Sequence, residues 1–290
     1  MKLETITGID RMRERSRAAH AQGIKVGFVP TMGYLHEGHL SLMRRARREC
    51  GLAVASIFVN PFQFGPEEDF ARYPRDLDHD MMLLERCETD LLFHPAASQI
   101  YPQGGPGYST WVGVEGLSDV LCGLSRPGHF RGVATVVTKL LNIVEPDVAY
   151  FGQKDAQQAI IIRTLVRDLN MTTRIEVCPT VREADGLAMS SRNKYLSAPE
   201  RRAATALYRA LSAAGAAAAG GERSPREIVG KARSVLEAEP LLKLEYLEIV
   251  SLDDLKPIAT TQLSGEALLA VAGRIGVTRL IDNITVAVKD

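Results

Sequence analysis

Short apolar runs and amphipathic stretches alternate along the first part of the chain. The apolar runs predict buried strands at 24–29, 52–59, 90–94, 147–151 and 174–178. The amphipathic stretches have helical spacing and lie at 40–50, 76–87, 130–144 and 156–169. This order predicts an α/β fold, a Rossmann-like, doubly wound parallel sheet with helices on both faces. Ligands of such folds bind beyond the carboxyl ends of the strands.

The pattern changes near residue 187, where alanine-rich and strand-like segments replace the earlier alternation. The segment 199–219 predicts a helix or a linker, and Ser224-Pro-Arg-Glu227 predicts a capping box that starts another helix. Strand-like runs follow at 243–250, 267–272 and 279–288. We therefore predict a Rossmann-like domain at 1–185 and a smaller α+β domain at 186–290, with a hinge near Asp185-Gly186.

Composition excludes some classes of function. Hydrophobic residues make up 46% and charged residues 24% of the chain, which is ordinary for a globular protein. Basic and acidic residues are equal at 35 each, and this balance argues against nucleic acid as a partner. Charge runs on helices usually face water, so the clustered arginines predict solvated helix faces. They are Arg11, Arg13, Arg15, Arg17, Arg44, Arg45, Arg47 and Arg48.

The cysteines and the apolar runs together predict a cytoplasmic protein. The four cysteines lie far apart without a C-x-x-C pair, so neither a zinc site nor a disulfide framework is predicted. Reduced thiols are typical of the cytoplasm. The first residues lack the apolar region of a signal peptide, and no apolar run reaches the roughly 20 residues of a membrane helix.

The first predicted strand leads into Pro30-Thr-Met-Gly-Tyr-Leu-His36-Glu-Gly-His39. Residues three apart on a helix share a face, and the first turn of a helix carries N–H groups and a positive dipole end that favour phosphate. Two imidazoles there can donate hydrogen bonds to a phosphate chain as charge builds on it. Gly33 and Gly38 let the backbone approach a ligand closely. The segment therefore predicts an enzyme that attacks the α-phosphate of ATP.

Two plainer interpretations of the histidine pair stay open at this point. The rings could be surface side chains, or they could form half of a metal site. A metalloprotease would place its histidines four apart in H-E-x-x-H, whereas His36 and His39 are three apart and enclose Gly38.

Two further polar segments follow predicted strands. Asn60-Pro-Phe-Gln63 could hold a small polar substrate by directed hydrogen bonds, or it could be a turn with an asparagine cap. In the second segment, Lys154 could neutralise phosphate, while Asp155 could cap a helix or bind a ribose or metal. Gln158 comes one helical turn after Lys154 and so is expected to face the same cavity. The alternative for Lys154 and Asp155 is an exposed ion pair.

Two loops carry groups that suit an anion. Arg126-Pro-Gly-His129-Phe-Arg131 concentrates basic side chains before the predicted helix at 130–144, as an anion site or a surface loop would. Met189-Ser-Ser-Arg192 offers two hydroxyls and a guanidinium after a glycine-containing turn. Small loops of this kind close over phosphates in many transferases, although Ser-Ser-Arg alone is a common sequence.

These segments, taken in order with Ile57-Phe-Val-Asn-Pro-Phe-Gln63-Phe and Phe151-Gly-Gln-Lys-Asp-Ala-Gln-Gln158, resemble the motifs of the pantoate–β-alanine ligase (pantothenate synthetase) family. The resemblance covers most of the chain. The family belongs to the HIGH-motif nucleotidyltransferases, which are related to class I aminoacyl-tRNA synthetases. His36-Glu-Gly-His39 resembles their first signature, and Met189-Ser-Ser-Arg192 resembles the second, with Arg192 where a lysine often lies.

The resemblance implies a two-step reaction. ATP and (R)-pantoate give pantoyl adenylate and pyrophosphate, and the β-alanine amine then attacks the acyl carbon to release pantothenate and AMP. Catalysis at phosphorus depends mainly on positioning and charge stabilisation, which donors and cations provide. Mg²⁺ is expected to bridge the phosphates, and no protein ligand is assigned to it.

The resemblance also implies roles for individual residues. His36, His39 and Lys154 are expected to be catalytic, with His39 as the proton donor. Pantoate and β-alanine are expected to bind at Asn60, Gln63, Arg126, His129 and Gln158. ATP is expected to bind at Pro30, Thr31, Met32, Gly33, Tyr34, Leu35, His36, Glu37, Gly38, His39, Gly152, Gln153, Lys154, Asp155, Val181, Met189, Ser190, Ser191 and Arg192.

Several expectations complete this picture. The partners are small-molecule substrates, with no nucleic acid and no membrane, and by resemblance the chain forms a homodimer whose smaller domain closes over the ATP site. Gln153 stands where the family often has glutamate, and Ala156 where it often has an aromatic residue. Two alternatives remain: transfer of AMP to another small acid, and a non-catalytic nucleotide- or RNA-binding relative of a synthetase. The neutral amides of Asn60, Gln63 and Gln158 favour a small hydroxy acid over a phosphorylated substrate.

Overall fold

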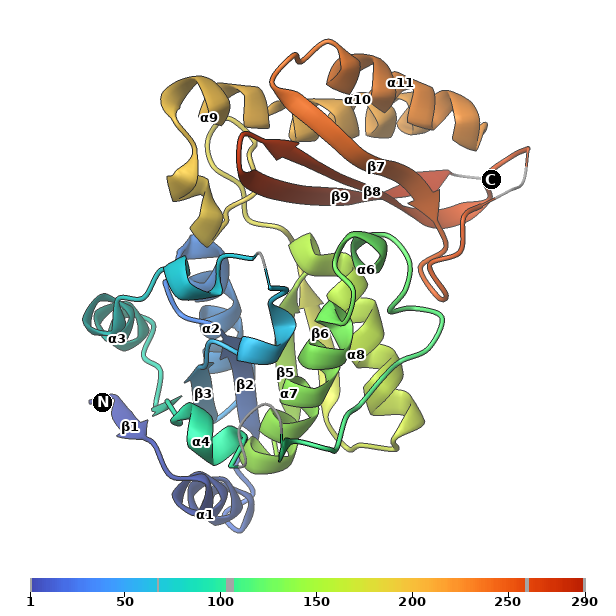
Figure 1. Ribbon diagram of the computed structural model, residues 1–290. Coiled ribbons are helices and arrows are strands. Elements are labelled where there is room, and N and C mark those ends of the chain that lie inside the picture. The colour runs from blue at the N-terminus through green and yellow to red at the C-terminus, as the bar shows by residue number, and fades with distance from the viewer. Residues whose placement is uncertain (1, 67, 103–106, 259–260, 289–290) are drawn as a thin grey trace. The chain divides into compact units, whose positions relative to one another are not determined.

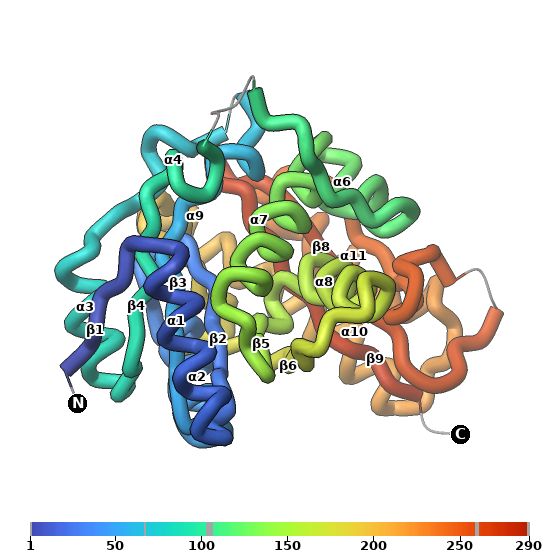
Figure 2. The backbone as a smooth tube through the Cα atoms, turned by 90° about the horizontal axis from the view of Figure 1, so that it is seen from below, coloured from blue at the N-terminus to red at the C-terminus, as the bar shows by residue number. Residues whose placement is uncertain are grey.

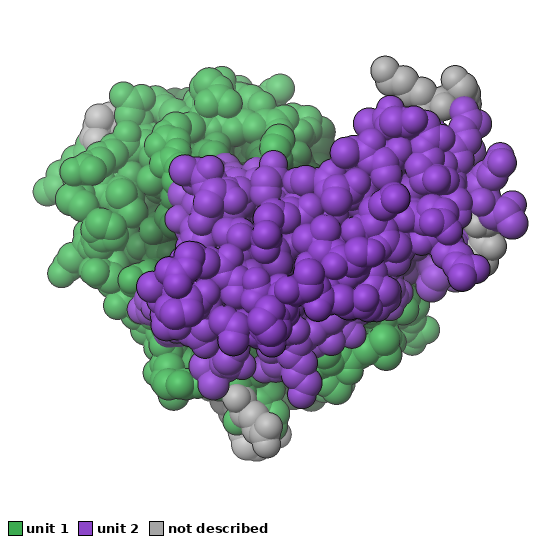
Figure 3. Space-filling model, turned by 90° about the horizontal axis from the view of Figure 1, so that it is seen from above, with its two compact units in different colours: residues 1–152, 158–179 green, residues 153–157, 180–290 purple. Residues whose placement is uncertain are grey.

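The computed structural model describes residues 2–66, 68–102, 107–258 and 261–288. The chain divides into two units, which Figure 3 colours separately. Unit 1 comprises residues 1–152 and 158–179, and unit 2 comprises residues 153–157 and 180–290. The short segment 153–157 thus belongs by its contacts to unit 2. The functional domains predicted at 1–185 and 186–290 stay a prediction.

A six-stranded parallel sheet forms the centre of unit 1 (Figure 1). Its strands run in the order β1-β4-β3-β2-β5-β6. Their bounds are β1 Glu4–Ile6, β2 Val26–Thr31, β3 Leu52–Ile57, β4 Leu91–Phe93, β5 Val148–Gly152 and β6 Arg174–Cys178. The five predicted strands are confirmed, and β1 is an additional edge strand. The strands β3 and β4 lie on one side of β2, and β5 and β6 lie on its other side. The direction in which strands are added therefore reverses between β2 and β5. Ligands of doubly wound folds bind at such a reversal.

Helices cover both faces of this sheet, as Figures 1 and 2 show from two directions. The longer ones are α1 Ile9–His20, α2 Glu37–Glu49, α3 Leu77–Arg86, α7 His129–Val144 and α8 Ala156–Asp168. Alternate strand residues point to opposite faces. One cluster joins the sheet to α1, α7 and α8 and includes Met12, Phe28, Val54, Val137 and Ile162. The other joins the sheet to α2 and α3 and includes Val29, Met43, Ala55, Leu84 and Leu92. Shorter helical pieces are η1 Pro61–Gln63, η2 Phe70–Arg72, α4 Ala97–Ile100, α6 Cys122–Ser125 and η3 Gln153–Asp155.

Unit 2 contains an antiparallel sheet in the order β7-β8-β9. The strands are β7 Leu242–Val250, β8 Gly265–Ile275 and β9 Thr278–Val288. Its helical pieces are η4 Ser191–Tyr195, α9 Ala198–Ala204, α10 Ala206–Ala219 and α11 Pro225–Glu237. Ala210, Leu211 and Ile228 of the helices pack with Leu269 and Val271 of β8. The predicted fold class, a Rossmann-like α/β sheet with a smaller α+β part, is confirmed.

The alanine-rich helix predicted at 199–219 is two helices. Thr205 separates them, because its backbone N–H bonds to the Arg202 carbonyl at 3.3 Å and its hydroxyl donates to the same oxygen at 2.8 Å. A side chain that bonds its own preceding turn in this way competes with the helical hydrogen bonds. Ser224 caps α11, since its hydroxyl accepts from the Glu227 N–H at 3.3 Å, but the predicted capping box is only half formed because the Ser224 N–H donates to Glu222 Oε1 at 2.8 Å. Within the described residues, the search for a helix that could span a membrane finds none.

Candidate active site

The two histidines of the Pro30–His39 segment cap the helix α2. His36 is the N-cap residue and has extended backbone, with φ −139° and ψ 173°. Its Nδ1 accepts from the Gly38 N–H at 3.2 Å, and the Nδ1 of His39 accepts from the His36 N–H at 3.3 Å. The ring centroids lie 4.1 Å apart. The rings are therefore neighbours as predicted, but by reciprocal capping, because His36 lies before the helix and shares no helical face with His39.

These caps determine which nitrogen of each ring carries the proton. A backbone N–H can only donate, so Nδ1 of His36 and Nδ1 of His39 are both acceptors. A neutral imidazole whose Nδ1 accepts carries its hydrogen on Nε2. Both rings are thereby held as Nε2–H donors, the form that hydrogen-bonds to a phosphate oxygen.

Three backbone N–H groups before α2 donate hydrogen bonds to side chains of the protein. The Gly33 N–H donates to the Thr31 hydroxyl oxygen at 3.1 Å. The Tyr34 and Leu35 N–H groups donate to the two carboxylate oxygens of Asp80 at 2.7 and 2.6 Å. The sequence argument assigned phosphate binding partly to N–H groups at the start of this helix. The N–H groups of Gly33, Tyr34 and Leu35 precede the first turn of α2, so phosphate binding by the N–H groups of that turn stays a prediction.

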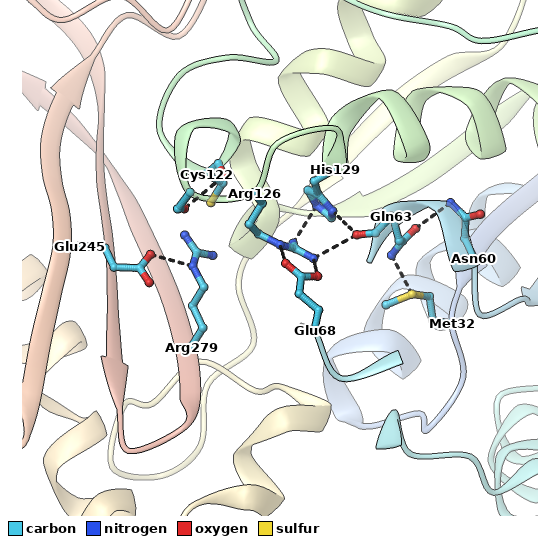
Figure 4. Close-up of polar contacts among 10 residues, drawn as sticks. Met32, Asn60, Gln63, Glu68, Cys122, Arg126, His129, Glu245 and Arg279 are labelled. Atoms are coloured by element: carbon cyan, nitrogen blue, oxygen red, sulfur yellow. Dashed lines mark hydrogen bonds and ion pairs between the residues drawn. The ribbon is translucent and has the colours of Figure 1, made fainter. Parts of the chain in front are cut away.

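Asn60 and Gln63 meet at the carboxyl end of β3 (Figure 4). Asn60 is buried and donates to the Gln63 Oε1 at 3.3 Å and to the Gly132 carbonyl at 3.1 Å, while the Tyr101 hydroxyl donates to its Oδ1 at 2.9 Å. Burial raises the pKa of Tyr101, so its hydroxyl stays protonated and donates. The Gln63 amide lies against the Met32 sulfur at 2.8 Å. Asn60 is thus a buried support for Gln63 and the turn, and its contact with substrate stays a prediction. Gln63 is half-buried beside the histidine segment.

Arg126 and His129 hold the backbone of Gln63 (Figure 4). The Gln63 carbonyl accepts from Arg126 at 3.2 Å and from His129 Nδ1 at 2.8 Å. Arg126 also donates to His129 Nε2 at 2.9 Å and to both oxygens of Glu68 at 2.7 and 2.6 Å. Since Nε2 accepts from a guanidinium that cannot accept, Nδ1 carries the hydrogen in the neutral ring. The two basic residues therefore position Gln63; their contact with β-alanine or phosphate stays a prediction.

Asn283 of β9 holds the segment that contains Lys154, and both lie in unit 2. The Asn283 amide donates to the carbonyls of Gln153 and Lys154 at 2.9 Å each, and the Gln153 amide donates to Asn283 Oδ1 at 3.0 Å. Lys154 Nζ lies 3.4 Å from Asp155 Oδ1. Lys154 lies in the 3-10 helix η3 and α8 follows directly, so the expectation that Gln158 faces the same cavity stays a prediction. Gln158 lies in α8 and belongs to unit 1.

The other predicted nucleotide residues of unit 2 form a small hairpin. The Met189 N–H donates to the Val181 carbonyl at 3.0 Å, and Arg182 pairs with Ala188 across a β-bridge. The Arg182 guanidinium donates to both oxygens of buried Asp282 at 2.6 and 3.0 Å.

After the hairpin, Ser190 caps η4 and accepts from the Arg192 N–H at 3.3 Å. Ser191 is buried within η4. The hydrogen bond from Met189 to Val181 brings Val181 next to the segment 189–192.

Sequence reasoning missed Asp80, Glu68, Asn283 and Asp282. The sequence does contain a signal for Asp80. It lies four residues before buried Leu84 on α3, so a charged residue occupies the buried face of this helix. Asn283 and Asp282 have no such signal, since their partners are about a hundred residues or more away.

The expected Mg²⁺ has no preformed cluster of side-chain ligands among the described residues. Residues 2–66, 68–102, 107–258 and 261–288 contain no group of three or more His, Cys, Asp or Glu side chains that could hold a metal ion. Mg²⁺ at nucleotide sites commonly binds through substrate phosphates with one or two carboxylates and several waters. The residues fit that mode, with Asp155 beside Lys154 as a carboxylate near the expected phosphates.

A Rossmann-like sheet whose second strand leads into a histidine-capped helix is typical of ATP-dependent nucleotidyltransferases. The comparisons with known proteins narrow this class. The family model described as pantoate-beta-alanine ligase matches residues 4–285. The pantothenate synthetase of Pelotomaculum thermopropionicum is 55% identical over 275 residues, 95% of this chain and 96% of its own length.

Solved structures agree with the family match. The pantothenate synthetase of Thermus thermophilus has a TM-score of 0.91 at 46% identity, with 98% of this chain and 99% of that chain covered. The pantoate-beta-alanine ligase of Francisella tularensis, complexed with beta-gamma ATP and beta-alanine, has a TM-score of 0.78 at 35% identity, with 97% of each chain covered. The chain belongs to the pantoate–β-alanine ligase family.

Proposed function

We propose that this chain joins (R)-pantoate to β-alanine in an ATP-dependent reaction that proceeds through pantoyl adenylate. In the first step a pantoate carboxylate oxygen bonds to the α-phosphorus, and the bond to pyrophosphate breaks. In the second step the β-alanine nitrogen bonds to the acyl carbon, and AMP leaves with the carboxylate oxygen. The observation that carries the proposal is the pair of capped imidazoles at the carboxyl end of β2, in a chain that matches this family throughout.

His36 and His39 act in the first step as Nε2–H donors. Negative charge grows on the phosphate oxygens and on the leaving pyrophosphate, and preorganised donors stabilise it without reorientation. The capping bonds hold both rings in the donor form before ATP binds. His39 is the proton donor to the leaving group, as the resemblance implies.

Gln63 and Gln158 bind pantoate through neutral amides. A hydroxy acid offers hydroxyl and carboxylate groups, which amides can meet as both acceptors and donors. Asn60 fixes the Gln63 side chain, and Arg126 with His129 fixes its backbone, so the amide is held at a set position. Gln63 also meets β-alanine in the second step.

The nucleotide is bound by residues 30–39, Gly152, Gln153, Lys154, Asp155, Val181 and residues 189–192. Lys154 neutralises phosphate charge, and Asp155 binds the ribose. Mg²⁺ bound together with ATP would offset part of the negative charge of the phosphates. The Francisella relative supports this, since its structure is described with beta-gamma ATP and beta-alanine bound.

Cell location, assembly and domain motion belong to the same proposal. We place the enzyme in the cytoplasm as a homodimer, with the domain at 186–290 closing over ATP. Sedimentation of the purified chain at several concentrations tests the dimer, and a mass equal to 31.7 kDa throughout would contradict it.

A product assay tests the function directly. The chain is incubated with ATP, (R)-pantoate and β-alanine, and mass spectrometry is expected to find pantothenate and AMP in equal amounts. Without β-alanine, pyrophosphate and pantoyl adenylate are expected, and without pantoate, neither product. AMP transfer to another acid in place of pantoate, or salt-sensitive retention of tRNA without catalysis, would favour the alternative functions.

A further inference from the structure

We infer that Asp80 is a positioning residue that sets the location of His36 and His39 through the backbone of Tyr34 and Leu35. The inference rests on the proposed function, because the reaction gives the two rings their role.

The Asp80 carboxylate is built into the turn before α2. Its side chain is 1% exposed, and its two oxygens each accept one backbone N–H, from Tyr34 at 2.7 Å and from Leu35 at 2.6 Å. An ionised carboxylate is an acceptor only, so it matches two converging donors. Burial raises the pKa of the Asp80 carboxyl, and the hydrogen bonds from Leu35 and Tyr34 oppose that rise.

The turn needs such a partner because its backbone is strained. Gly33 has φ +81° and Tyr34 has φ +52°, so two consecutive residues adopt the left-handed region. For a residue other than glycine this conformation costs about 1–2 kcal/mol. Successive N–H groups in this conformation form a concave site for an anion, and here the anion is the carboxylate of Asp80. A Cβ at Gly33 would lie 3.0 Å from Asp80 Oδ2 and from Ile57 Cγ2, so the carboxylate is closely seated.

The location of the rings depends on this anchor. The reciprocal caps hold His36 and His39 to each other, and α2 packs on the sheet through side chains such as Met43. The turn that leads into them is anchored by Asp80 and by Thr31, whose hydroxyl donates to the Ser56 carbonyl at 2.7 Å and accepts from Gly33. Leu35 directly precedes His36, so movement of the turn moves both rings.

Asp90, the residue directly before β4, offers a matched control in the same unit. Its carboxylate also accepts a backbone N–H, from Ala53 at 2.7 Å, and it pairs with Arg47 at 3.1 Å. These contacts lie at the amino end of β3, the opposite edge from the histidine turn. If Asp80 only stabilised the fold, substitution of either aspartate would affect kcat in the same way. If Asp80 positions the histidines, only its substitution lowers kcat.

The test compares Asp80→Asn with Asp90→Asn in pantoate-dependent ATP–pyrophosphate exchange. Asp80→Asn turns one acceptor into an NH₂ group that faces a backbone N–H. We expect kcat to fall on the order of 10²-fold, as misplaced catalytic groups typically do, with KM for pantoate unchanged. Asp90→Asn is expected to lower Tm to a similar degree and keep the wild-type kcat. Wild-type kcat in Asp80→Asn, or losses in both variants that follow Tm alone, would overturn the inference.

Histidine ¹⁵N NMR gives a readout that does not depend on the reaction. The chain has six histidines, so the signals of His36 and His39 can be assigned with single variants. Asp80→Asn is expected to shift both signals and Asp90→Asn neither. Unshifted signals in Asp80→Asn contradict the inference, whereas a wild-type enzyme without pantoate-dependent exchange contradicts only the proposed function.

Asp80→Glu covers the case in which Asp80→Asn does not fold. It keeps both oxygens and the charge but moves them by one methylene group. We expect shifted histidine signals and a kcat lower by about tenfold, between wild type and Asp80→Asn. Shifted signals with a wild-type kcat would show that the turn's location does not matter, and would overturn the inference.

Discussion

Two segments that we assign to the nucleotide are held in opposite ways. The histidine pair is organised by hydrogen bonds between residues two and three positions apart. The segment Gln153–Asp155 is held by Asn283, 130 positions after Gln153. A short-range arrangement forms wherever its own few residues are present. A long-range arrangement forms only when the strand that carries Asn283 has folded.

The two segments also differ in the chemistry that they offer. His36 and His39 are neutral donors with fixed direction, which suit charge that develops in the transition state. Lys154 is a point charge on a flexible side chain, which suits phosphate in the ground state and the transition state alike. We therefore expect damage to the first segment to lower kcat and damage to the second to raise KM for ATP.

The largest effect is expected for His39→Ala. This variant removes one donor and also the acceptor of the His36 N–H. Loss of one transition-state donor typically costs about 10²–10³-fold in kcat. Pyrophosphate release in the presence of pantoate measures the loss. A near-wild-type rate would contradict the role given to His39 and the contrast between the two segments.

A smaller effect is expected for Asn283→Ala. The change removes three hydrogen bonds that hold the backbone of Gln153 and Lys154 and the Gln153 side chain. We expect KM for ATP to rise about tenfold, equivalent to about 1.4 kcal/mol, with little change in kcat. Steady-state kinetics with varied ATP measures both constants. Asn283→Asp, which keeps the shape and loses the two donors, is the matched variant; a fall in kcat alone would reverse the assignment.

The ion pair of Glu68 with Arg126 joins residues at an intermediate separation, 58 positions apart in the same unit. Burial is the largest single influence on the Glu68 carboxyl and raises its pKa, but the hydrogen bonds and charge of Arg126 together with a backbone hydrogen bond from the 65–68 turn outweigh it, so the folded pKa lies below the ordinary value. A depressed folded pKa adds stability that is present above the unfolded pKa of about 4.3 and is lost as pH falls through the folded pKa.

Glu68→Gln should therefore lower the free energy of unfolding at pH 7 and lose its effect in acid. We expect a difference of about 1–2 kcal/mol at pH 7, typical of a hydrogen bond to a charged group, that shrinks toward zero near pH 3. Urea unfolding at a series of pH values measures it. A difference that does not change with pH would show that the Glu68 charge contributes nothing.

The smallest effect is the coupling between Gln153 and Asn283. Their side-chain hydrogen bond is 3.0 Å long. In a double-mutant cycle of Gln153→Ala and Asn283→Ala, we expect a coupling energy of about 1 kcal/mol in ATP binding. Additive effects would mean that Asn283 acts through the backbone carbonyls alone.

Sequence reasoning succeeded where the relevant partners are close in the chain. The apolar runs located β2 to β6, and the spacing of His36 and His39 located the paired rings. It misplaced the start of α2, expected at residue 40 and found at Glu37, because an N-cap histidine is an unusual signal. It also joined α9 and α10, since the alanine-rich composition hides the bond between the Thr205 hydroxyl and Arg202.

Sequence reasoning failed where partners come from distant elements. Asp80 and Leu35 are 45 positions apart, and Arg126 and Glu68 are 58 apart. No local pattern links such residues, because only the packing of the strands brings their elements together. The same packing joins the N–H groups of Tyr34 and Leu35 to the Asp80 carboxylate.

The central claim is that imidazole side chains, and not the engaged backbone N–H groups, meet the phosphates of ATP. A crystal structure of the chain with a non-hydrolysable ATP analogue tests it most directly. We predict a phosphate oxygen within about 3.2 Å of Nε2 of His36 or His39, with Tyr34 and Leu35 still bonded to Asp80. A triphosphate remote from both rings, or held by the N–H groups of Tyr34 and Leu35, would contradict the account.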